Sequence, residues 1–594
     1  MLPTSLTPLN SLSFFCYNLS MLNLTGNALR VLSARYLLKN EKGEVFESPE
    51  GMFRRVASHV ARAEGFYGEE TQAWEQRFFT LMTELKFLPN SPTLMNAGKE
   101  IGQLAACFVL PVDDSMKSIF DTLKNTALIL QSGGGTGFSF SRLRPRSDIV
   151  RTTGGIASGP VSFMKIYNTA TEVIKQGGAR RGANMGILRI DHPDILDFIE
   201  AKRSQGELTN FNISVAVTDA FMAALKKDTE YELVNPRTGK PVGRLRARTV
   251  FDAIVSSAHE TGDPGLVFID RINRFNPTPH LGEIESTNPC GEQPLLPYEA
   301  CVLGSMNLSK YVRNSIVDNP AGSPVIDYES LGEDIRVAVR FLDDCIDTNR
   351  YPLPEIERMH KGNRKIGLGV MGWADMLVLL GIRYNSDQGF SLAREVMRFI
   401  QTRSREASAE LAGKRGVFPN FKGSVYDAPG MPKVRNATTT TIAPTGTISI
   451  IADCSSGIEP IFALAYRRLI LDTELVEVNK YFFALARKLG FYSRELEKKV
   501  LMKGRLRGIR EVPAEIKRLF KTAHEIPPKD HIEMQAAFQE YTDNAVSKTV
   551  NLPKSAKRTD VEKAFLLAYE KGCKGVTVFR YGARKTGTLM RLMD

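Results

Sequence analysis

Apolar residues in the first part of the chain recur at the spacing of an α-helix. Met52, Val56 and Val60 are four residues apart, so helical folding places them on one face. The segment from residue 74 to residue 82 repeats this helical spacing. We therefore predict a helical N-terminal domain over residues 23–89, preceded by a disordered extension at residues 1–22.

Beyond residue 90 the period of the pattern changes repeatedly. Short apolar runs such as Cys107-Phe108-Val109-Leu110 alternate with amphipathic segments such as residues 119–129. Strand-like runs that alternate with helix-like segments imply βα units, and a large α/β barrel accommodates this order. No internal repeat or low-complexity tract marks a boundary. We therefore predict one continuous α/β domain over residues 90–594.

Composition excludes several classes of protein. No stretch approaches the roughly 20 consecutive apolar residues that a membrane helix needs. No basic residue precedes the run Leu12-Ser13-Phe14-Phe15 and no convincing cleavage site follows it, which argues against a secretory signal. The seven cysteines are sparse and include no CxxC pair. We therefore expect a reducing cytoplasm, no disulfide framework and no structural metal.

The chain is basic, with a net charge of +12 at pH 7. Such a charge suits a polyanionic partner, either nucleic acid or the phosphates of nucleotides. The segment Gly-Gly-Ala-Arg-Arg-Gly-Ala at residues 177–183 has the look of an RGG-type nucleic-acid element, but no aromatic residues are interleaved with its arginines. Charge alone therefore leaves both kinds of partner open.

The strongest candidate for chemistry is the segment Asn288-Pro289-Cys290-Gly291-Glu292. Proline and glycine favour a loop, and in an extended loop Asn288, Cys290 and Glu292 face one way and can address one ligand. Nucleophilic catalysis by the thiol needs a histidine base, and none of the seven histidines lies in a motif-like setting. A buried cysteine that acts as a small hydrophobic residue is the other alternative.

Two further segments are rich in small or hydroxyl residues. The turn at residues 444–449, Pro-Thr-Gly-Thr-Ile-Ser, follows a threonine-rich strand. Backbone N–H groups and hydroxyls in such a turn can surround a phosphate, although an ordinary hydroxyl-stabilised turn has the same composition. The glycines at residues 133–135 allow the backbone to approach a nucleotide, or they form a plain turn.

Taken together, these motifs resemble the large subunit of ribonucleotide reductase. In that family Asn-x-Cys-x-Glu lies on a finger loop at the centre of a ten-stranded α/β barrel, which a helical N-terminal domain precedes. The likeness runs from about residue 24 to residue 587. It includes Ser-Pro-Thr-Leu-Met-Asn-Ala-Gly at 91–98, Cys-Phe-Val-Leu at 107–110, Ser-Gly-Gly-Gly-Thr-Gly at 132–137, Arg-Lys-Ile-Gly-Leu-Gly at 364–369 and Ala-Pro-Thr-Gly-Thr at 443–447.

The resemblance implies a role for each residue of the candidate loop. Cys290 becomes the thiyl radical that abstracts the 3′-hydrogen of a ribonucleotide, Glu292 takes the proton of the 3′-hydroxyl, and Asn288 holds the ribose hydroxyls. Cys107 and Cys301 supply two reducing equivalents and finish as a disulfide. The expected activity is the reduction of ribonucleoside diphosphates to deoxyribonucleotides.

The resemblance also implies two nucleotide sites. The substrate site is expected to consist of Thr93, Ala106, Cys107, Gly135, Asn288, Cys290, Glu292, Pro444, Thr445, Gly446, Thr447 and Ile448. Ala106 stands where relatives often have a hydroxyl residue nearby, so its contact is expected to be through the backbone. A deoxynucleotide effector is expected to bind Asp114, Ser115, Arg144, Lys175, Gln176 and Arg180.

The family makes its radical in three ways. An oxygen-dependent large subunit needs a tyrosine pair near the last barrel strand, and residues 576–582, Val-Thr-Val-Phe-Arg-Tyr-Gly, contain none. The same segment matches a glycyl-radical segment poorly. The resemblance therefore implies adenosylcobalamin as the cofactor. An oxygen-dependent subunit with a radical-generating partner is one alternative, and a non-catalytic nucleotide- or nucleic-acid-binding protein is another.

The C-terminal region departs from the family pattern. Cys573 is the only cysteine among the last hundred residues, whereas relatives usually carry a reducing cysteine pair in a mobile tail. Either the tail is missing from this sequence, or a thioredoxin-like or other external reductant or a separate chain does its work. The N-terminus leaves no room for an ATP-binding activity domain, so no on/off control by ATP and dATP is expected. By analogy we expect a cytoplasmic homodimer with no membrane or nucleic-acid partner.

Overall fold

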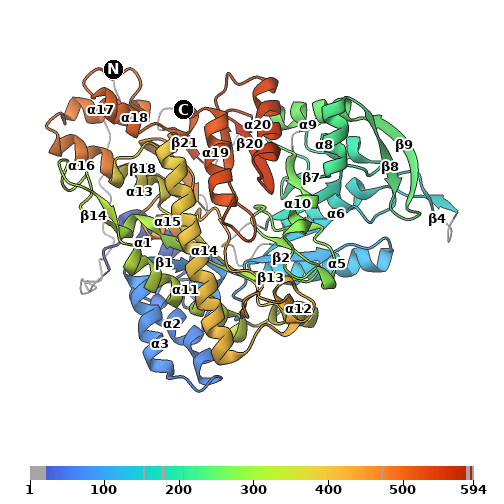
Figure 1. Ribbon diagram of the computed structural model, residues 1–594, viewed down its shortest axis with the longest axis horizontal. Helices are drawn as coiled ribbons and strands as arrows, with labels where there is room; N and C mark the ends of the chain where they lie inside the picture. Colours follow the sequence, from blue (N-terminus) through green and yellow to red (C-terminus); the bar gives the residue numbers. More distant parts are fainter. Residues whose placement is uncertain are drawn as a thin grey trace.

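The N-terminal part of the chain is helical, as the pattern predicts. The computed structural model describes residues 22–150, 154–174, 182–204, 206–470, 473–583 and 589–591 (Figure 1). It begins with α1 (Gly26–Arg35), α2 (Pro49–Gly65) and α3 (Thr71–Thr83). Met52 and Val56 are fully buried on α2. Apart from Leu22, the extension expected at residues 1–22 lies outside the described residues.

Local sequence signals set the start of α2. Ser48 precedes the helix and accepts a hydrogen bond from the backbone N–H of Gly51 at 3.0 Å. Pro49 occupies the first turn, where its missing N–H leaves no helical hydrogen bond unmade. Both features favour a helix that begins at this point.

A ten-stranded sheet forms the centre of the molecule. Nine of its strands fall into two groups, and neighbours within each group are parallel. The first group is β2 (Cys107–Pro111), β3 (Gly135–Ser139), β6 (Asn184–Arg189), β7 (Phe211–Val217) and β10 (Gly265–Phe268); the second contains β13 (Ala300–Asn307), β16 (Ile366–Met371), β19 (Thr549–Leu552) and β20 (Gly575–Arg580). The groups meet in the antiparallel pairs β2–β13 and β10–β20.

A short segment at residues 440–442 closes this sheet into a barrel. Parallel bridges join Leu368 to Thr440 and Ile442 to Val546, so the segment lies between β16 and the approach to β19. It completes the second group of five strands, while the short strand β1 (Phe87–Pro89) pairs with the end of β13. The arrangement confirms the expected ten-stranded α/β barrel.

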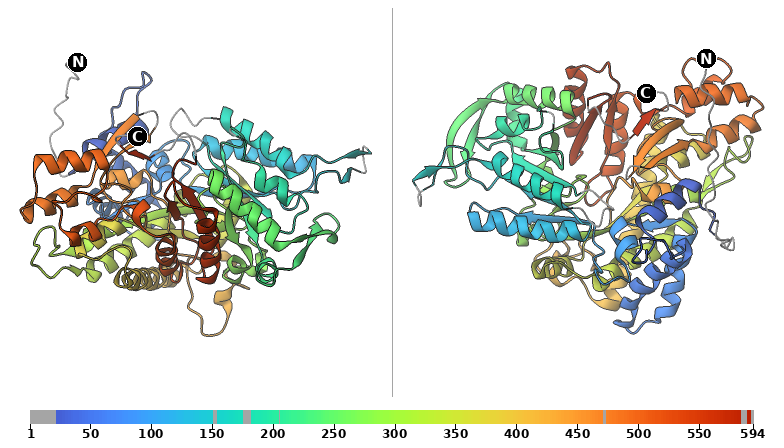
Figure 2. Two further views of the ribbon diagram at one scale, coloured as in Figure 1. Left: turned by 90° about the horizontal axis from the view of Figure 1, so that it is seen from above. Right: turned by 180° about the vertical axis from the view of Figure 1, so that it is seen from behind.

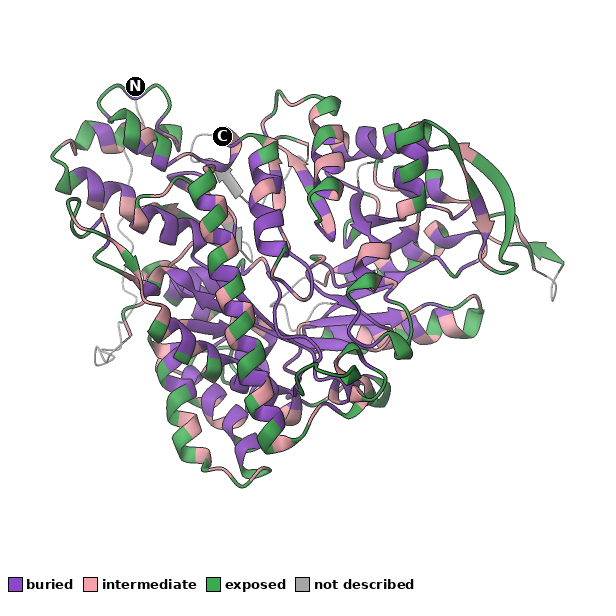
Figure 3. Cartoon of the chain, viewed as in Figure 1, coloured by how far each residue is buried: buried purple, intermediate pink, exposed green. Residues whose placement is uncertain are grey.

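Helices cover the outside of the barrel (Figure 2). The strands β2 and β13 are buried on both faces, whereas the outer face of the long helix α14 is exposed (Figure 3). The covering helices are α4 (Ser91–Asn96), α5 (Met116–Gln131), α6 (Pro160–Val173), α7 (Ile195–Glu200), α8 (Asp219–Lys227), α9 (Ala247–Thr261), α10 (Ile269–Arg274), α11 (Tyr328–Thr348), α12 (Pro354–Asn363), α13 (Trp373–Leu380), α14 (Asp387–Arg415), α19 (Pro528–Gln539) and α20 (Arg558–Glu570).

The remaining elements extend the barrel at its edges. They are the hairpins β4 (Ile149–Val150) with β5 (Gly155–Ile156), β8 (Glu230–Asn235) with β9 (Lys240–Arg246) and β14 (Val312–Arg313) with β15 (Val325–Ile326), the sheet of β17 (Ala465–Ile470), β18 (Thr473–Val478) and β21 (Leu589–Arg591), and the helices α15 (Ile448–Ile451), α16 (Lys480–Lys488), α17 (Arg494–Lys503) and α18 (Ala514–Leu519). No helix in the described ranges is both long enough and apolar enough to cross a membrane.

A network of buried charges joins the N-terminal helices to the barrel. Glu64 of α2 forms ion pairs with Arg340 of α11 and, at 2.8 Å, with Arg415 of α14. Arg415 also pairs with Asp343 at 3.2 Å and with Asp344 at 2.6 Å. All five side chains are less than a tenth exposed. A buried charge is tolerated only when it is paired, so each partner in this network depends on the others.

Asp343 lies at the centre of this network. Burial opposes the ionisation of its carboxyl group, but the nearby guanidinium groups of Arg364 and Arg435 outweigh burial and hold the pKa of Asp343 at about 2. Because the pKa is lower than in the unfolded chain, the ionised carboxylate stabilises the fold above the unfolded pKa of about 3.9. This contribution is lost as the pH falls toward 2.

We predict that Asp343→Asn lowers the free energy of unfolding by about 3–5 kcal/mol at pH 7, because it removes the buried carboxylate that Arg364, Arg415 and Arg435 share. Urea unfolding followed by circular dichroism measures the change. The control Asp252→Asn removes an exposed ion pair with Arg248 and should cost no more than about 1 kcal/mol. Equal effects of the two substitutions would contradict the prediction, as would a variant that loses stability below pH 4 as steeply as the original chain.

Candidate active site

A hairpin carries the candidate loop into the barrel. Its strands are β11 (Ser286–Thr287) and β12 (Pro294–Leu295), and β11 lies against β2, β3 and β6. The hairpin can lie this close because β3 has a glycine at position 137. A Cβ atom at Gly137 would lie 1.7 Å from the carbonyl oxygen of Thr287. The finger loop is therefore seated directly on the backbone of β3.

Hydrogen bonds fix the shape of the loop. The Asn288 side-chain oxygen accepts from the N–H of Gln293 at 3.0 Å, and the Asn288 carbonyl accepts from the N–H of Gly291 at 3.1 Å. Gly291 has a φ of 80°, which favours glycine at this turn. At the far side of the barrel the carbonyl of Glu292 accepts from the N–H of Ala545 at 2.9 Å. The loop thus spans the barrel and is held at both ends.

The loop brings Asn288 against one of the two expected redox cysteines. The Asn288 amide nitrogen lies 3.0 Å from the Cys107 sulfur. Cys107 on β2 and Cys301 on β13 are direct partners across the antiparallel seam between the two strand groups. Such partners have Cα atoms about 4.5–5.5 Å apart, within the roughly 4.4–6.8 Å that a disulfide spans. The two thiols, 194 positions apart in the sequence, are thus placed to form one.

The environment keeps both thiols protonated. Burial raises the pKa of Cys107 well above its usual value, and the carboxylate of Glu292 raises it further. Burial likewise raises the pKa of Cys301, against the opposing influence of the Lys365 ammonium. Cys290 differs from both, because it is exposed at the tip of the loop. The arrangement therefore separates one accessible sulfur from a buried pair of thiols.

Lys365 belongs to a polar cluster behind Cys301, a position that the motif at residues 364–369 did not reveal. Its ammonium group pairs with the Glu299 carboxylate at 2.7 Å, and both side chains are 1% exposed. Asn363 also donates a hydrogen bond to Glu299, as does the backbone N–H of Leu296, at 2.6 Å. The cluster thus places the ammonium group of Lys365 near Cys301. The carboxylate of Glu299 balances this charge, and both of its oxygens accept hydrogen bonds.

The expected substrate residues converge on one cavity of about 280 Å³. Arg35, the last residue of α1, and the following Tyr36 also line this cavity, although the sequence did not single them out. The expected residues that line it are Ala106, Cys107, Gly135, Asn288, Cys290, Glu292, Pro444, Thr445, Gly446, Thr447 and Ile448.

Thr93 is the expected substrate residue that does not line the cavity. It is buried, and its hydroxyl donates to the carbonyl of Leu104 at 3.0 Å, while its N–H donates to the Asn90 side chain at 3.0 Å. Its neighbours Ser91 and Pro92 line the cavity instead. Thr93 thus fixes the turn that presents these two residues.

The turn at residues 444–448 forms one wall of the cavity. Thr445 has a φ of 55°, and its hydroxyl accepts a hydrogen bond from the N–H of Gly457 at 2.7 Å. The Arg35 guanidinium donates to the Thr447 hydroxyl at 3.1 Å, which brings a positive charge from α1 to the wall. A cation beside a turn of hydroxyl and small residues is an arrangement that suits a phosphate.

Three of the expected effector residues lie together at the start of α5. The Asp114 carboxylate pairs with the Arg144 guanidinium at 2.8 Å. Ser115 precedes α5 and accepts a hydrogen bond from the N–H of Ser118 at 3.1 Å. The other expected effector residues, Lys175, Gln176 and Arg180, lie outside the described residues.

Asn212 and the last barrel strand face the loop from the opposite wall. The Asn212 amide nitrogen donates to the carbonyl of Pro289 at 2.8 Å. Val576 and Val578 of β20 belong to the hydrophobic core that lies outside the barrel. Because side chains alternate along a strand, Thr577 and Phe579 point toward the barrel interior. The residues that this strand presents inward are therefore a threonine and a phenylalanine, not a tyrosine pair.

Family models match almost the whole described chain. A model described as "Ribonucleotide reductase, all-alpha domain" matches residues 22–102, and one described as "Ribonucleotide reductase, barrel domain" matches residues 105–433 and 430–579. The chain belongs to the ribonucleotide reductase family. This finding confirms the resemblance that the motifs indicated.

Curated ribonucleotide reductases of high similarity carry a common description. The chain is 51% identical to the "Vitamin B12-dependent ribonucleoside-diphosphate reductase" of Thermoplasma acidophilum, over 94% of this chain and 79% of the relative. It is 50% identical to the protein of the same description from Mycobacterium tuberculosis strain CDC 1551 / Oshkosh, over 95% of this chain and 80% of the relative.

A solved ribonucleotide reductase has the same fold. The Actinobacillus ureae class Id ribonucleotide reductase alpha subunit matches with a TM-score of 0.76 at 24% identity, over 94% of this chain and 97% of the solved chain. At this level of identity the likeness bears on the fold alone, and it agrees with the barrel described above.

We predict that Gly137→Ala destabilises this reductase by about 1–3 kcal/mol, because the added methyl group collides with Thr287 and forces the finger loop off β3. Gly243→Ala is the matched control, since a Cβ atom there would meet only Leu233, at 3.9 Å. Urea unfolding of both variants tests the prediction. Equal stabilities would show that the loop does not depend on this close approach.

A second prediction concerns the cluster behind Cys301. Lys365→Met should lower the free energy of unfolding by about 3–5 kcal/mol, because Glu299 is left as a buried carboxylate without its cation. The double variant Lys365→Met/Glu299→Leu should recover most of the loss, because it removes both charges. Thermal or urea unfolding of the two variants provides the comparison, and a double variant no more stable than the single one would refute this explanation.

Proposed function

We propose that this ribonucleotide reductase converts ribonucleoside diphosphates into 2′-deoxyribonucleoside diphosphates for DNA synthesis, with adenosylcobalamin as its radical source. One observation carries the proposal: the exposed Cys290 and the cross-strand thiol Cys107 line one cavity, with Cys301 buried beside Cys107. The descriptions of the Thermoplasma and Mycobacterium relatives support the same substrate class and cofactor.

The loop residues act on the ribose. As a thiyl radical, Cys290 takes the hydrogen atom from C3′, since an S–H bond is weak enough to exchange hydrogen with a ribose carbon. Glu292 accepts the proton of the 3′-hydroxyl as a general base. Asn288 holds the ribose hydroxyls, and its bond to Cys107 keeps that thiol beside the reacting carbon.

The buried pair supplies the reducing equivalents. Cys107 protonates the 2′-hydroxyl, which leaves as water, and the two cysteines together give up two hydrogen atoms as they form a disulfide. Cys290 then returns its hydrogen atom to C3′ and is again a radical. The balance is one ribonucleotide and one dithiol converted into one deoxyribonucleotide, one water and one disulfide. The raised pKa values of Cys107 and Cys301 keep both protons in place until the reaction uses them.

The cofactor would have to lie outside the substrate cavity. The cavity of about 280 Å³ is too small for a nucleotide and a corrin ring together, since small-molecule sites alone span roughly 300–1,000 Å³. Cys290, Asn212 and Thr577 are exposed, so Asn212 and Thr577 are the residues we assign to hold the cofactor over the thiol. Bound adenosylcobalamin supplies a radical by homolysis of its cobalt–carbon bond.

The substrate phosphates belong on the turn at residues 444–448. Thr447 and the guanidinium of Arg35 can bind them together, with the backbone N–H groups of the turn. On the other side of the cavity Gly135 lets the finger loop approach β3, since a Cβ atom there would lie 2.9 Å from the ring of Pro289.

The reductant and the effector complete the proposal. A thioredoxin-like or other external dithiol reduces the disulfide, and a deoxynucleotide binds near Asp114, Ser115 and Arg144.

A homodimer is supported by large apolar side chains exposed on the neighbouring helices α5 and α6. These side chains are Met116, Phe120 and Leu128 on α5 and Ile166 and Val173 on α6.

An oxygen-dependent subunit with a radical-generating partner is the second candidate. It requires tyrosines that pass the radical to Cys290, and the inward positions of β20 hold Thr577 and Phe579. The geometry therefore favours the cofactor.

The test is anaerobic turnover of CDP with adenosylcobalamin and dithiothreitol. We predict that Cys290→Ala lowers the rate of deoxycytidine diphosphate formation by at least about a thousand-fold. The control Cys573→Ala changes a buried cysteine outside the cavity and should retain activity. Product formed by Cys290→Ala, or formed equally well without the cofactor, would overturn the proposal.

A further inference from the structure

A second and larger cavity lies away from the cysteines. It has a volume of about 840 Å³ and shares no lining residue with the substrate cavity. Its walls come from separate parts of the chain: the segment after α17, helix α18, the turn before α19, and the segments that follow β19 and β20. We call it the basic pocket, lined by Arg505, Leu506, Arg507, Gly508, Lys517, Arg518, Lys521, His524, Glu525, Pro553, Lys554, Ser555 and Tyr581.

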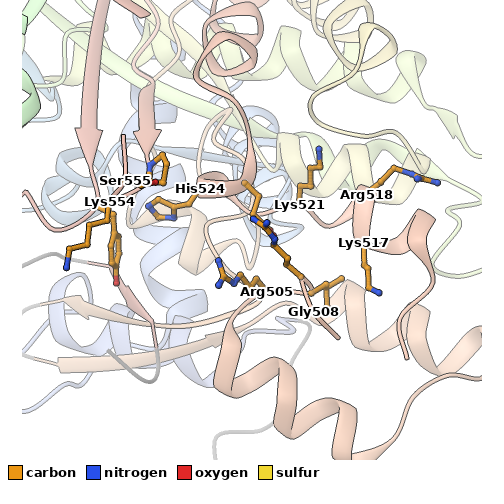
Figure 4. Close-up of a pocket in the computed structure, with 13 residues that line it drawn as sticks. Arg505, Gly508, Lys517, Arg518, Lys521, His524, Lys554 and Ser555 are labelled. Carbon is orange, nitrogen blue, oxygen red and sulfur yellow. The ribbon is translucent and has the colours of Figure 1, made fainter. Parts of the chain in front are cut away.

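The charge of the basic pocket is almost entirely positive. The cationic residues of the lining extend along the pocket, and Figure 4 shows Lys554 toward one end and Arg518 toward the other. The acidic residue of the lining, Glu525, accepts hydrogen bonds from the N–H and hydroxyl of Thr522, at 3.0 and 2.8 Å, and so is occupied within its own turn. Arg518 is paired with Glu515.

Arg518 is the cation of the pocket lining whose charge a neighbouring carboxylate balances in the described part of the chain. Within the described part of the chain, no carboxylate lies within ion-pair distance of the remaining five, which are Arg505, Arg507, Lys517, Lys521 and Lys554. Five cations around one cavity repel one another, and this repulsion raises the free energy of the pocket when no anion is present. A ligand with several negative charges relieves the repulsion, whereas a ligand with one charge relieves little of it.

An aromatic wall accompanies the charges. The rings of His524 and Tyr581 meet edge to face with their centroids 5.1 Å apart, and Phe462 packs against His524 from behind at 5.5 Å. Flat side chains of this kind offer a surface on which a nucleobase can stack. The volume lies in the range of about 300–1,000 Å³ that is usual for small-molecule sites.

We propose that the basic pocket binds a nucleoside triphosphate, with the polyphosphate on the five unneutralised cations and the base against His524 and Tyr581. Lysine and arginine both bind phosphate oxygens through charge-assisted hydrogen bonds. The site is separate from the substrate cavity and from Asp114, Ser115 and Arg144. Tyr581 directly follows β20, whose Thr577 faces the barrel interior, so an occupied pocket lies next to the strand that borders the radical site.

The experiment is photolabelling of the cobalamin-free protein with 8-azido-ATP, followed by peptide mapping. We expect label in peptides from residues 505–525 or 553–583, and we expect inorganic tripolyphosphate to displace it. The double variant Lys521→Glu/Lys554→Glu should lose this label by about tenfold or more, because two attractive charges become repulsive. Label in peptides of the substrate or effector site should persist, and it reports that the variant is folded.

The matched control is Lys226→Glu/Lys240→Glu, which makes the same change in net charge at exposed lysines on α8 and β9. It should retain the label in the basic pocket. Label confined to the substrate and effector peptides would overturn the proposal. So would pocket label that cyanocobalamin or a single-stranded oligonucleotide displaces at lower concentration than tripolyphosphate does. The measurement uses neither the cofactor nor a reductant, so its outcome is independent of the proposed reduction.

Discussion

A loop that crosses the inside of a barrel must satisfy its backbone polar groups without help from bulk water, and the rest of the site depends on how this chain does so. Thr287 rests against the backbone of β3 at Gly137, the Pro289 carbonyl receives the amide of Asn212, and the Glu292 carbonyl receives the N–H of Ala545. These contacts fix the backbone on both sides of Cys290. The position of the sulfur is thus determined by β3, by β7 and by the segment that leads into β19, and not by the loop alone.

The same barrel sets the electrostatics of the thiols. Two of the three cysteines of the site are buried and have a raised pKa, and Glu292 adds to this effect at Cys107. Lys365 opposes it at Cys301, but its own charge is balanced by Glu299 at 2.7 Å. A cation so near a thiol without a counterion would favour the thiolate, which reacts with oxidants and other disulfides. In the proposed reaction, the buried ion pair therefore lets Cys107 and Cys301 serve as the reducing pair without exposing them to side reactions.

Much of this architecture could be predicted from the sequence, because the information was local. Helical spacing identified α2, and the Asn-x-Cys-x-Glu segment identified the loop and its three facing side chains. The partners contributed by distant strands could not be found in this way. Nothing near Asn212 or Arg35 signals that the fold brings them to the site, and the motif at residues 364–369 gave no role for Lys365, because these contacts form only when the barrel closes. Thr93 shows the opposite limit, since the motif pointed to the right turn but its neighbours Ser91 and Pro92 line the cavity.

The seam between the two groups of parallel strands has a further consequence. Cys107 belongs to the first group and Cys301 to the second, and they face each other where β2 meets β13. A disulfide between them is a covalent cross-link across a joint that otherwise depends on hydrogen bonds. The disulfide formed in each turnover would therefore cross-link the two halves of the barrel covalently, and each reduction would break this link. Oxidation at this position is a mechanical change as well as a chemical one, and the barrel that awaits a reductant is the more rigid of the two forms.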